Sequence, residues 1–480
     1  MNMANRLSSE VANITRMYPE RIVQFGGGNF LRGFVDWVVD ILNEETDFCS
    51  GIALVKATPG SYDDLDAQDC LFTTYLHGIR DGNFVEETRL VSSVNRTVYP
   101  YQNFADYLEL ARQDPIRFIF SNTTEAGIVF SEDDKLTDEP PASFPAKLAR
   151  LLYERYRHFE AAPEKGCIII PTELIEDNAA RLREIILQYA RLWGLDAGFG
   201  DWIMGHNMFC NTLVDRIIPG FPEADAERIF AGLGYEDHLL VAGETYHSWI
   251  IEAPRRLLDE FPVSHTRTPL NVRIVDDAAP YRTIKVRLLN GAHSSMAPIG
   301  LLLGIESVRE AMEHDALGPF IEGLLDEEVI PSVTEAPRAE LDAFARDVLD
   351  RFRNPHIHHR LLTISLNSSS KVKERILPSI LGYLEERGEL PSRLVLALAA
   401  FIRLYKGEWR GEMIALNDDP RVLDWFREQW SRADSHNDLA ETVLASRALW
   451  DRDLSQIPGL VDRVSENLRA IEAGQLLALL

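Results

Sequence analysis

The strongest constraint on the fold is a short apolar run that leads directly into a glycine-rich turn and then a helical run. Arg21–Phe25 has the composition of a buried strand, Gly26–Gly33 carries three consecutive glycines, and Phe34–Leu42 has the apolar content of a helix. In this order, glycines let the backbone approach a pyrophosphate that faces the N-terminus of the helix. We therefore predict a strand–turn–helix unit with a dinucleotide site at the turn. The residues predicted to form this site are Phe25, Gly26, Gly27, Gly28, Asn29, Phe30, Leu31, Arg32 and Gly33.

The glycine motif is incomplete, because Leu31 stands where G-x-G-x-x-G requires its third glycine. A tight turn between strand and helix that binds no nucleotide is therefore the alternative interpretation.

Apolar strands and helices alternate over residues 20–275, which predicts an α/β fold with a mainly parallel, doubly wound, Rossmann-type sheet. After Tyr281 the pattern changes to long helical periodicities. With 480 residues and 46% hydrophobic content, the chain can form two cores. We predict a nucleotide-binding domain at 1–277 and a mainly α-helical substrate domain at 278–480. The further predicted strands are Gly51–Val55, Arg117–Phe120, Cys167–Ile170 and, as the last, Asn271–Val275; predicted helices include Leu317–Leu325 and Leu394–Leu404.

Residues at two predicted strand ends bear on the cofactor. An NAD enzyme often has Asp or Glu after the second strand, to bind the ribose hydroxyls, but here Lys56 follows. A lysine could favour a 2′-phosphate, so its chemistry does not exclude NADP; a solvated strand end explains it equally well. Asn122 and Thr123 follow a later strand and are candidate ribose or nicotinamide contacts, with an ordinary polar turn as the alternative.

An amine, an amide and an imidazole lie within nine residues of core-like sequence: Lys285, Asn290 and His293. A lysine with a lowered pKa can take a proton from an alcohol, while an amide and an imidazole can hold the oxygen that becomes a carbonyl. On an ideal helix, Asn290 and His293 would lie roughly 140° and 80° around the axis from Lys285. Asp277 could cap this helix and Pro280 suits its first turn. The alternative is a surface lysine, a helix-ending Asn-Gly and a satisfied histidine.

A second polar segment is basic in an otherwise acidic chain. Its positive residues form a solvated or salt-bridged face, or one or two of them bind a substrate carboxylate. Three histidines also lie here, but three within four residues and without a carboxylate at ligand spacing do not favour a metal site. The basic residues are Arg353, Arg360, Lys371, Lys373 and Arg375, and the histidines are His356, His358 and His359.

The net charge of −26 argues against nucleic acid and anionic membrane surfaces as partners. An anionic substrate would need its own arginine or lysine. No run of residues is apolar enough for a signal core or a membrane span. The scattered cysteines predict buried, reduced thiols in a cytoplasmic protein; they are Cys49, Cys70, Cys167 and Cys210.

Together, three motifs resemble the mannitol dehydrogenase family of polyol-specific long-chain dehydrogenases. They are Gly26–Arg32, Val214–Pro219 and Lys285-x4-Asn290-x2-His293, and the resemblance covers nearly the whole chain. It implies a Rossmann-type domain followed by a helical domain, NAD(H) and no catalytic metal. Within the family, the chain is most similar to the members that act on hexuronates. This implies reversible reduction of the ketone of D-tagaturonate to D-altronate in hexuronate breakdown.

The resemblance also implies roles for individual residues. Lys285 is the general acid/base, Asn290 and His293 position the reacting oxygen, and Asp215 supports the substrate side of the site or else caps a helix or pairs with Arg216. Family members that act on neutral polyols hold the oxygen with a further Asn, where this chain has Leu174 and the nearest amide is Asn178. Either Asn178 takes that role as a substrate contact, or Asn290 acts without a second amide. Arg360 and Lys371 are the predicted contacts to a substrate carboxylate.

Other functions fit the same motifs. The nearest are reduction of fructuronate to mannonate and of fructose to mannitol, which differ by a stereocentre or a carboxylate. An NAD-dependent epimerase and a non-catalytic nucleotide-binding regulator are more distant alternatives. No oligomeric state is predicted.

Overall fold

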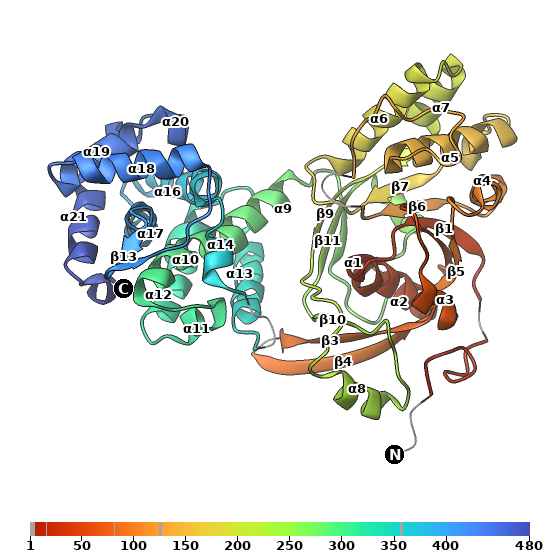
Figure 1. Cartoon of the computed structure of the whole chain (residues 1–480), viewed down its shortest axis with the longest axis horizontal. Coiled ribbons are helices and arrows are strands. Elements are labelled where there is room, and N and C mark those ends of the chain that lie inside the picture. The colour runs from red at the N-terminus through yellow and green to blue at the C-terminus, as the bar shows by residue number, and fades with distance from the viewer. Residues whose placement is uncertain (1–4, 16, 81, 124–126, 356–358) are drawn as a thin grey trace. The chain divides into compact units, whose positions relative to one another are not determined.

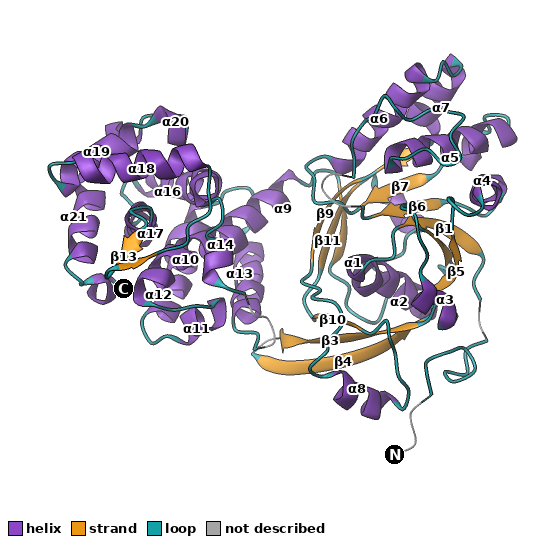
Figure 2. Ribbon diagram, in the orientation of Figure 1, coloured by secondary structure: helices purple, strands orange, loops and turns teal. Residues whose placement is uncertain are grey.

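A computed structural model describes residues 5–15, 17–80, 82–123, 127–355 and 359–480 (Figure 1). The chain forms two compact units. Unit 1 comprises Met1–His77 and Val85–Ala278, and unit 2 comprises Gly78–Phe84 and Ala279–Leu480. Unit 1 combines sheets and helices, whereas unit 2 is almost entirely helical (Figure 2).

Unit 1 is built on a six-stranded sheet of order β5-β2-β1-β6-β7-β8, in which every neighbouring pair is parallel. The strand order reverses beside β1, because β2 lies on one side of it and β6 on the other. Open sheets of this kind bind ligands at the carboxyl ends of the strands at such a reversal. The predicted parallel sheet is confirmed. Its strands are β1 Glu20–Phe25, β2 Gly51–Val55, β5 Val94–Val98, β6 Phe118–Ser121, β7 Ile168–Pro171 and β8 Met208–Phe209.

The central strands of this sheet are largely buried on both faces, which explains their long apolar runs, whereas β5 carries three half-buried polar residues. Within β1, Ile22 packs into the core that contains the helix after the glycine turn, while Val23 and Phe25 pack into the opposite core. The first helix is continuous and consists of α1 Asn29–Leu31, η1 Arg32–Asp36 and α2 Trp37–Glu45. The helices of the opposite layer are α4 Phe104–Arg112, α5 Phe144–His158, α6 Asn178–Leu192 and α7 Ala197–His206.

Two small sheets in unit 1 correct the prediction of a single sheet. One has the order β10-β3-β4 and the other β12-β11-β9. The predicted last strand of the doubly wound sheet is β12, which instead pairs with β11 in the second small sheet, where β9 runs antiparallel to β11. The strands are β3 Phe72–Arg80, β4 Asn83–Val91, β9 Asn211–Asp215, β10 Val241–Glu244, β11 Ser248–Glu252 and β12 Val272–Val275; α3 Asp63–Ala67 and α8 Ala226–Leu233 complete the unit.

Unit 2 confirms the predicted helical domain. Its centre is α17 Ser392–Leu404, which is buried from Leu394 to Leu404. Among the described residues from Ala279 onward, the only strands are the two-residue β13 Glu408–Trp409 and β14 Glu412–Met413, which the sequence did not predict. The Gly78–Phe84 segment of unit 2, which the predicted boundary at 277/278 assigns to the first domain, belongs to the β3–β4 hairpin. The other α-helices are α9 Ala279–Ile284, α10 Gly291–Leu303, α11 Val308–Glu313, α12 Leu317–Gly323, α13 Arg338–Phe352, α14 Leu361–Ile364, α15 Ser368–Lys371, α16 Leu377–Arg387, α18 Pro420–Arg432, α19 His436–Ala445, α20 Arg447–Trp450 and α21 Leu460–Glu472.

Four helices contain a π-helical turn, a rare feature that is frequent at functional sites. One turn follows the glycine loop in unit 1, and two carry candidate site residues in unit 2. The four segments are η1 Arg32–Asp36, η4 Lys285–Asn290, η5 Leu324–Val329 and η7 Val372–Ile376.

Two expectations from composition were tested by the structure. Within the described ranges, no helix is long and apolar enough to cross a membrane. All four cysteines are free thiols, and three are buried as predicted, but Cys49 is exposed.

Candidate active site

The glycine loop turns sharply between β1 and the first helix. Gly26 has a φ of 107°, and its N–H donates to the Val55 carbonyl at 3.1 Å. A Cβ atom at Gly26 would lie 3.2 Å from the Asn122 carbonyl oxygen, whereas one at Gly28 would meet open space. The loop therefore needs glycine at 26 for its conformation, and it leaves room for a ligand beside Gly28 and the helix N-terminus.

The predicted cofactor residues divide into two groups. Gly28 and Asn29 are exposed, but the side chains of Phe25, Leu31 and Arg32 are buried, as is Gly33. These four buried residues shape the loop, so only their main-chain atoms could meet a ligand.

Arg32 shows how the buried group works. Its guanidinium donates to the Gly27 carbonyl at 3.2 Å, to the Leu239 carbonyl and to Asn29 Oδ1 at 2.8 Å, and it lies over the Phe72 ring. Arg32 thus stabilises the loop by hydrogen bonds from its buried side, and its charge faces the protein interior.

The ends of β6 and β7 are joined by a hydrogen-bond network around Glu173, which the sequence analysis missed. The Glu173 carboxylate accepts the Thr123 N–H at 2.9 Å, the Thr123 hydroxyl at 3.0 Å and the Ser121 hydroxyl at 3.1 Å. Burial raises the pKa of Glu173, and these hydrogen bonds oppose that rise. Asn122 donates to the carbonyl and hydroxyl oxygens of Thr172 at 2.9 and 3.1 Å. The predicted contacts Asn122 and Thr123 are therefore held by protein partners. The available signal was an acidic residue two positions after the end of a strand.

Asn178 does not take the substrate role that the sequence suggested. Its side chain is fully buried and donates to Pro171, Glu173 and Thr212, while its oxygen accepts the N–H groups of Thr212 and Ala179. These bonds use the whole capacity of the amide. Asn178 therefore connects α6 to β7 and β9 as a structural residue.

Lys285 and Asn290 lie on one continuous helix that runs from α9 through η4 into α10. The interpretation of Asn290-Gly291 as a helix end is therefore wrong, and Pro280 lies in the first turn of α9 as predicted. The π-helical turn spans Lys285 to Asn290, and its i→i+5 pattern brings these two residues closer to one line than the roughly 140° of an ideal α-helix. Both are half-buried, and the Asn290 amide has no side-chain hydrogen bond to any described residue.

His293 is held between two rings. It stacks on Phe352 with centroids 4.3 Å apart, and its edge meets His359 at 4.8 Å. The residue is half-buried, but its Nε2 atom is shielded from solvent and has no hydrogen-bond partner among the residues described. Burial lowers the pKa of His293 well below its usual value, and nearby positive charges add to this effect. The imidazole is therefore neutral, with an unsatisfied nitrogen.

Four basic side chains lower the pKa of His293 through their charge. We call them the basic cluster: Arg351, His359, Lys371 and Arg375. Lys371 Nζ donates to the Ile364 carbonyl at 2.9 Å, and Arg375 Nη1 donates to Ser294 Oγ at 3.3 Å. Burial lowers the pKa of both Lys371 and Arg375, and the charge of Arg375 lowers that of Lys371 further. Within the described part of the chain, neither has a carboxylate at ion-pair distance. The charges of Asp418 and Glu374 partly offset the shifts of Lys371 and Arg375, respectively, but neither carboxylate forms an ion pair with them. Two neighbouring cations without an ion-pair partner are suited to bind an anion.

The remainder of the basic segment has other partners. Arg353 is paired with Glu322, and Lys373 with Asp451 at 3.0 Å. Arg360 is exposed and joins Ser307 through a backbone bridge, and it is not among the groups that lower the His293 pKa. The structure therefore does not support Arg360 as a buried carboxylate contact, whereas Lys371 belongs to the basic cluster.

Two of the three histidines considered for a metal, His356 and His358, lie outside the described residues. Among the residues described, no group of His, Cys, Asp and Glu is arranged to hold a metal ion.

Asp215 ends β9 in unit 1, where it lies opposite Ser248 of β11, and it is half-buried. The adjacent Arg216 donates to the carbonyls of Glu244 and Gly33, both at 2.9 Å, and its guanidinium lies 4.3 Å from the Trp37 ring centroid. Arg216 therefore connects the helix after the glycine loop to β10.

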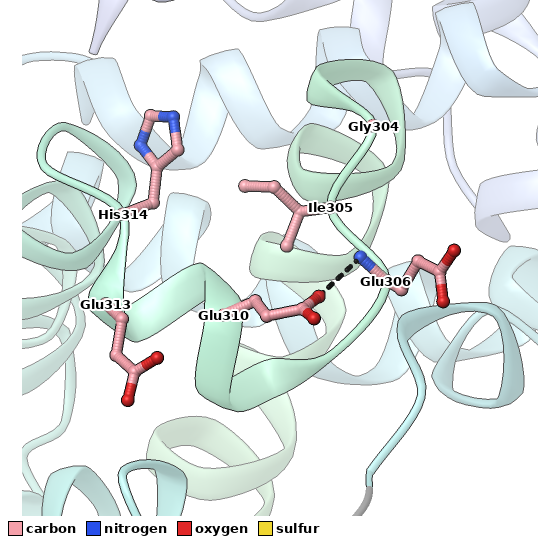
Figure 3. A pocket seen from close by; sticks show the side chains of 6 residues that line it. All are labelled: Gly304, Ile305, Glu306, Glu310, Glu313 and His314. Atoms are coloured by element: carbon pink, nitrogen blue, oxygen red, sulfur yellow. Dashed lines mark hydrogen bonds between the residues drawn. The ribbon is translucent and has the colours of Figure 1, made fainter.

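A separate hollow of about 450 Å³ lies in unit 2 (Figure 3). One of its acidic residues, Glu310, accepts the Glu306 N–H at 3.0 Å and forms the capping box of α11 with Ser307. The acidic lining disfavours an anionic ligand. The lining residues are Gly304, Ile305, Glu306, Glu310, Glu313 and His314.

Comparison with family models decides the affiliation. Residues 20–263 match the mannitol dehydrogenase Rossmann domain, and residues 277–472 match the mannitol dehydrogenase C-terminal domain. The chain belongs to the mannitol dehydrogenase family. It is therefore an oxidoreductase, and the predicted family is confirmed.

Two relatives within the family are both named altronate oxidoreductase. That of Pectobacterium carotovorum subsp. carotovorum (strain PC1) is 45% identical over 467 residues, covering 95% of each chain. That of Bacillus subtilis (strain 168) is 45% identical over 468 residues, covering 97% of this chain and 95% of the relative.

Two solved structures share the fold. A D-sorbitol dehydrogenase in substrate-free form aligns with a TM-score of 0.77 at 23% identity, over 96% of this chain and 95% of the other. The mannitol 2-dehydrogenase of Pseudomonas fluorescens, in a ternary complex with NAD and D-mannitol, aligns with a TM-score of 0.64 at 22% identity, over 96% and 94%.

Proposed function

We propose that this chain catalyses the reversible, NAD(H)-dependent reduction of D-tagaturonate to D-altronate. The observation that carries the proposal is the basic cluster around the neutral His293 of a chain whose net charge is −26. The lysine and two arginines of the cluster are buried or half-buried cations, which an anion stabilises, and a sugar acid supplies one. The two relatives named altronate oxidoreductase support the same substrate class.

The residues of unit 1 fit a dinucleotide. The open space beside Gly28 and the N-terminus of a helix that continues to Glu45 suit a pyrophosphate. A Rossmann domain in the family model, and NAD in the complex of the Pseudomonas fluorescens relative, support NAD(H) as the cofactor. When bound, NADH supplies the hydride that reduces the carbonyl carbon.

In unit 2 we assign the proton transfer to Lys285. As the carbonyl carbon is reduced, its electron pair moves onto the oxygen, and the Lys285 ammonium delivers the proton that completes the alcohol. Asn290 and His293 hold the oxygen while its charge develops. The unpaired amide of Asn290 and the unsatisfied Nε2 of His293 support this assignment, because each has hydrogen-bonding capacity that no described residue uses.

The substrate carboxylate is assigned to the basic cluster, with Arg375 and Lys371 as its principal partners. An arginine can bind a carboxylate through two parallel hydrogen bonds. A hydrogen bond to a charged group contributes about 1.5–3 kcal/mol. A neutral ketose that lacks the carboxylate should therefore bind roughly 10- to 100-fold more weakly.

The test is the loss of nicotinamide absorbance when the purified protein receives NADH and either tagaturonate, fructuronate or fructose, repeated with NADPH. We expect tagaturonate to be reduced fastest. Faster turnover of fructuronate would retain the carboxylate site but reject the proposed stereochemistry. Faster turnover of fructose would reject the carboxylate site. Binding of nucleotide without consumption of NADH would favour the epimerase or the regulator.

A further inference from the structure

At the carboxyl end of β2, Lys56 and Tyr62 form a pair that reaches the glycine loop; we call it the Lys56–Tyr62 pair. Lys56 Nζ lies 4.8 Å from the centroid of the Tyr62 ring and donates to Thr58 Oγ1 at 3.0 Å. The Tyr62 hydroxyl oxygen accepts the N–H of Gly27 at 3.0 Å. The pair thus joins the end of one strand to the loop that follows its neighbour.

The pair is held in place from several sides. The Lys56 N–H donates to the Val98 carbonyl at 2.9 Å, and the Tyr62 N–H donates to the Tyr99 hydroxyl at 3.0 Å. A Cβ atom at Gly27 would lie only 3.2 Å from Cζ of Tyr62, so loop and ring are in close contact. No bound ligand is needed to position the ring, which makes this a pre-organised part of the site.

The Tyr62 hydroxyl retains a hydrogen to donate. Its oxygen is an acceptor for Gly27, and within the described ranges no protein acceptor receives its own hydrogen. Burial raises the pKa of Tyr62, so the phenol stays protonated at neutral pH. A phenol that is fixed by a loop N–H and still holds its hydrogen can donate to a ligand oxygen beside the loop.

Lys56 supplies a partly exposed positive charge at this edge of the sheet, whereas the Lys147 ammonium, which donates to the Tyr101 hydroxyl at 3.1 Å, belongs to a fully buried side chain. Among the described residues in the three positions after each of β1, β2, β5, β6 and β7, Lys56 is the only cation. Arg32 is close in sequence, but its guanidinium is engaged by Gly27, Leu239 and Asn29. In a chain with a net charge of −26, a phosphate at this edge would therefore find its positive partner in Lys56.

We propose that the Lys56–Tyr62 pair binds a phosphate group of the dinucleotide, Tyr62 by donating its hydroxyl hydrogen and Lys56 by its charge. The inference rests on the proposed function, because it takes the glycine loop to be the NAD(H) site. Two phosphates share this chemistry: the pyrophosphate present in every such dinucleotide, and the 2′-phosphate that only NADP(H) carries.

The test measures nucleotide affinity without any sugar substrate. Lys56→Gln keeps a stem that can cover the Tyr62 ring but removes the charge, and Lys135→Ala removes an exposed lysine charge elsewhere in unit 1 as the matched control. We expect Lys56→Gln to raise the dissociation constant roughly tenfold, since a charge-assisted hydrogen bond is lost. Equal losses for NADH and NADPH would assign the pair to the pyrophosphate, and a loss confined to NADPH would assign it to the 2′-phosphate. Lys135→Ala should change neither affinity.

Tyr62→Phe tests the donor. It should weaken both nucleotides by a smaller factor than Lys56→Gln, because the freed Gly27 N–H can itself turn to the phosphate. Adenosine, which has no phosphate, should compete with NADH equally well in the wild type and in both variants.

Unchanged affinity of Lys56→Gln for both nucleotides would overturn the proposal, as would an equal loss of adenosine binding. Because Lys56 is half-buried and makes its one side-chain hydrogen bond to Thr58, Lys56→Gln remains a valid test if Tyr62→Phe fails to fold. Failure of the proposed function can be distinguished from failure of the phosphate-binding role of the Lys56–Tyr62 pair. A wild-type protein that binds NADH but reduces no ketose rejects the proposed function and leaves the affinities of the variants to decide the role of the pair.

Discussion

The glycine loop of unit 1 and the basic cluster of unit 2 differ in how far protein partners satisfy their polar groups. Around the loop, Arg32, Asn122 and Thr123 are paired with protein atoms. In the basic cluster, Lys371 and Arg375 lack a carboxylate partner among the described residues, and His293 Nε2 has no partner at all among them. Apart from the Lys56–Tyr62 pair, the side chains around the loop are therefore satisfied by protein atoms, whereas the cluster retains side-chain capacity that a substrate can use. The following predictions test that contrast.

The largest effect is expected at Lys285. Replacing it with alanine should reduce turnover roughly 10²–10⁴-fold, which is the contribution of general acid/base catalysis. The affinity for NADH should stay unchanged, as measured by fluorescence titration. Near-normal turnover in this variant would remove Lys285 from the mechanism.

Two asparagines allow a direct comparison of a free amide with a satisfied one. Asn290→Ala should lower kcat roughly 10²-fold or more, because it removes a donor to the developing oxyanion, and it should leave the melting temperature close to that of the wild type. Asn178→Ala should instead lower the free energy of unfolding by about 1–3 kcal/mol, because it leaves buried partners unsatisfied. Activity per folded molecule and thermal melts of both variants provide the measurement. Reversed effects would show that the hydrogen-bond inventory does not separate structure from function.

Two neighbouring lysines sharpen the comparison inside unit 2. Lys371→Met should raise KM for a uronate roughly tenfold, because a charge-assisted contact is lost, with little change for fructose. Lys373→Met is the matched control, since Lys373 is paired with Asp451 and should leave both values unchanged. If the two variants show the same change in KM, the basic cluster does not bind the substrate carboxylate.

The last prediction concerns stability and an exception in unit 1. Asp36 lies in the π-helical turn after the loop, both of its carboxylate oxygens are buried without a partner among the described residues, and burial raises its pKa to about 7. Since the folded state favours the neutral acid, Asp36 should cost stability as the pH rises from about 4 to about 7. Asp36→Asn should match the wild type in thermal unfolding near pH 4 and exceed it progressively up to pH 7–8. A stability difference that does not vary with pH would show that Asp36 does not titrate in this way.

The sequence was a good guide where local pattern determines structure. The predicted strands of the parallel sheet are buried on both faces, so they could be recognised in the sequence as apolar runs. The glycine turn identified the first helix. The run at Asn271–Val275 was also recognised as a strand, but an apolar run does not specify its partner, and β12 pairs with β11 instead. The turn at Lys285–Asn290 was placed on an ideal α-helix because π-helical turns are rare and occur as single turns within α-helices.

The candidate site was harder to predict from the sequence. Whether a basic or amide side chain is free to bind a ligand depends on partners that lie far away in the sequence. Arg353 and Lys373 are neutralised by Glu322 and Asp451, which lie far away in the sequence, while Arg375 is left in the cluster. Asn178 was chosen for its proximity to Leu174 in the sequence, but Thr212 and Pro171 use its amide. Which polar groups stay unsatisfied is a property of the folded chain.

The most direct test of the central claim is the ratio of kcat/KM for tagaturonate to that for fructose, measured with NADH in the wild type and in Arg375→Met. We predict a ratio of at least roughly tenfold in the wild type, which falls toward one in the variant because the uronate alone loses its charge partner. A wild-type ratio near one, or a ratio that the variant leaves unchanged, would contradict the assignment of the basic cluster to a substrate carboxylate.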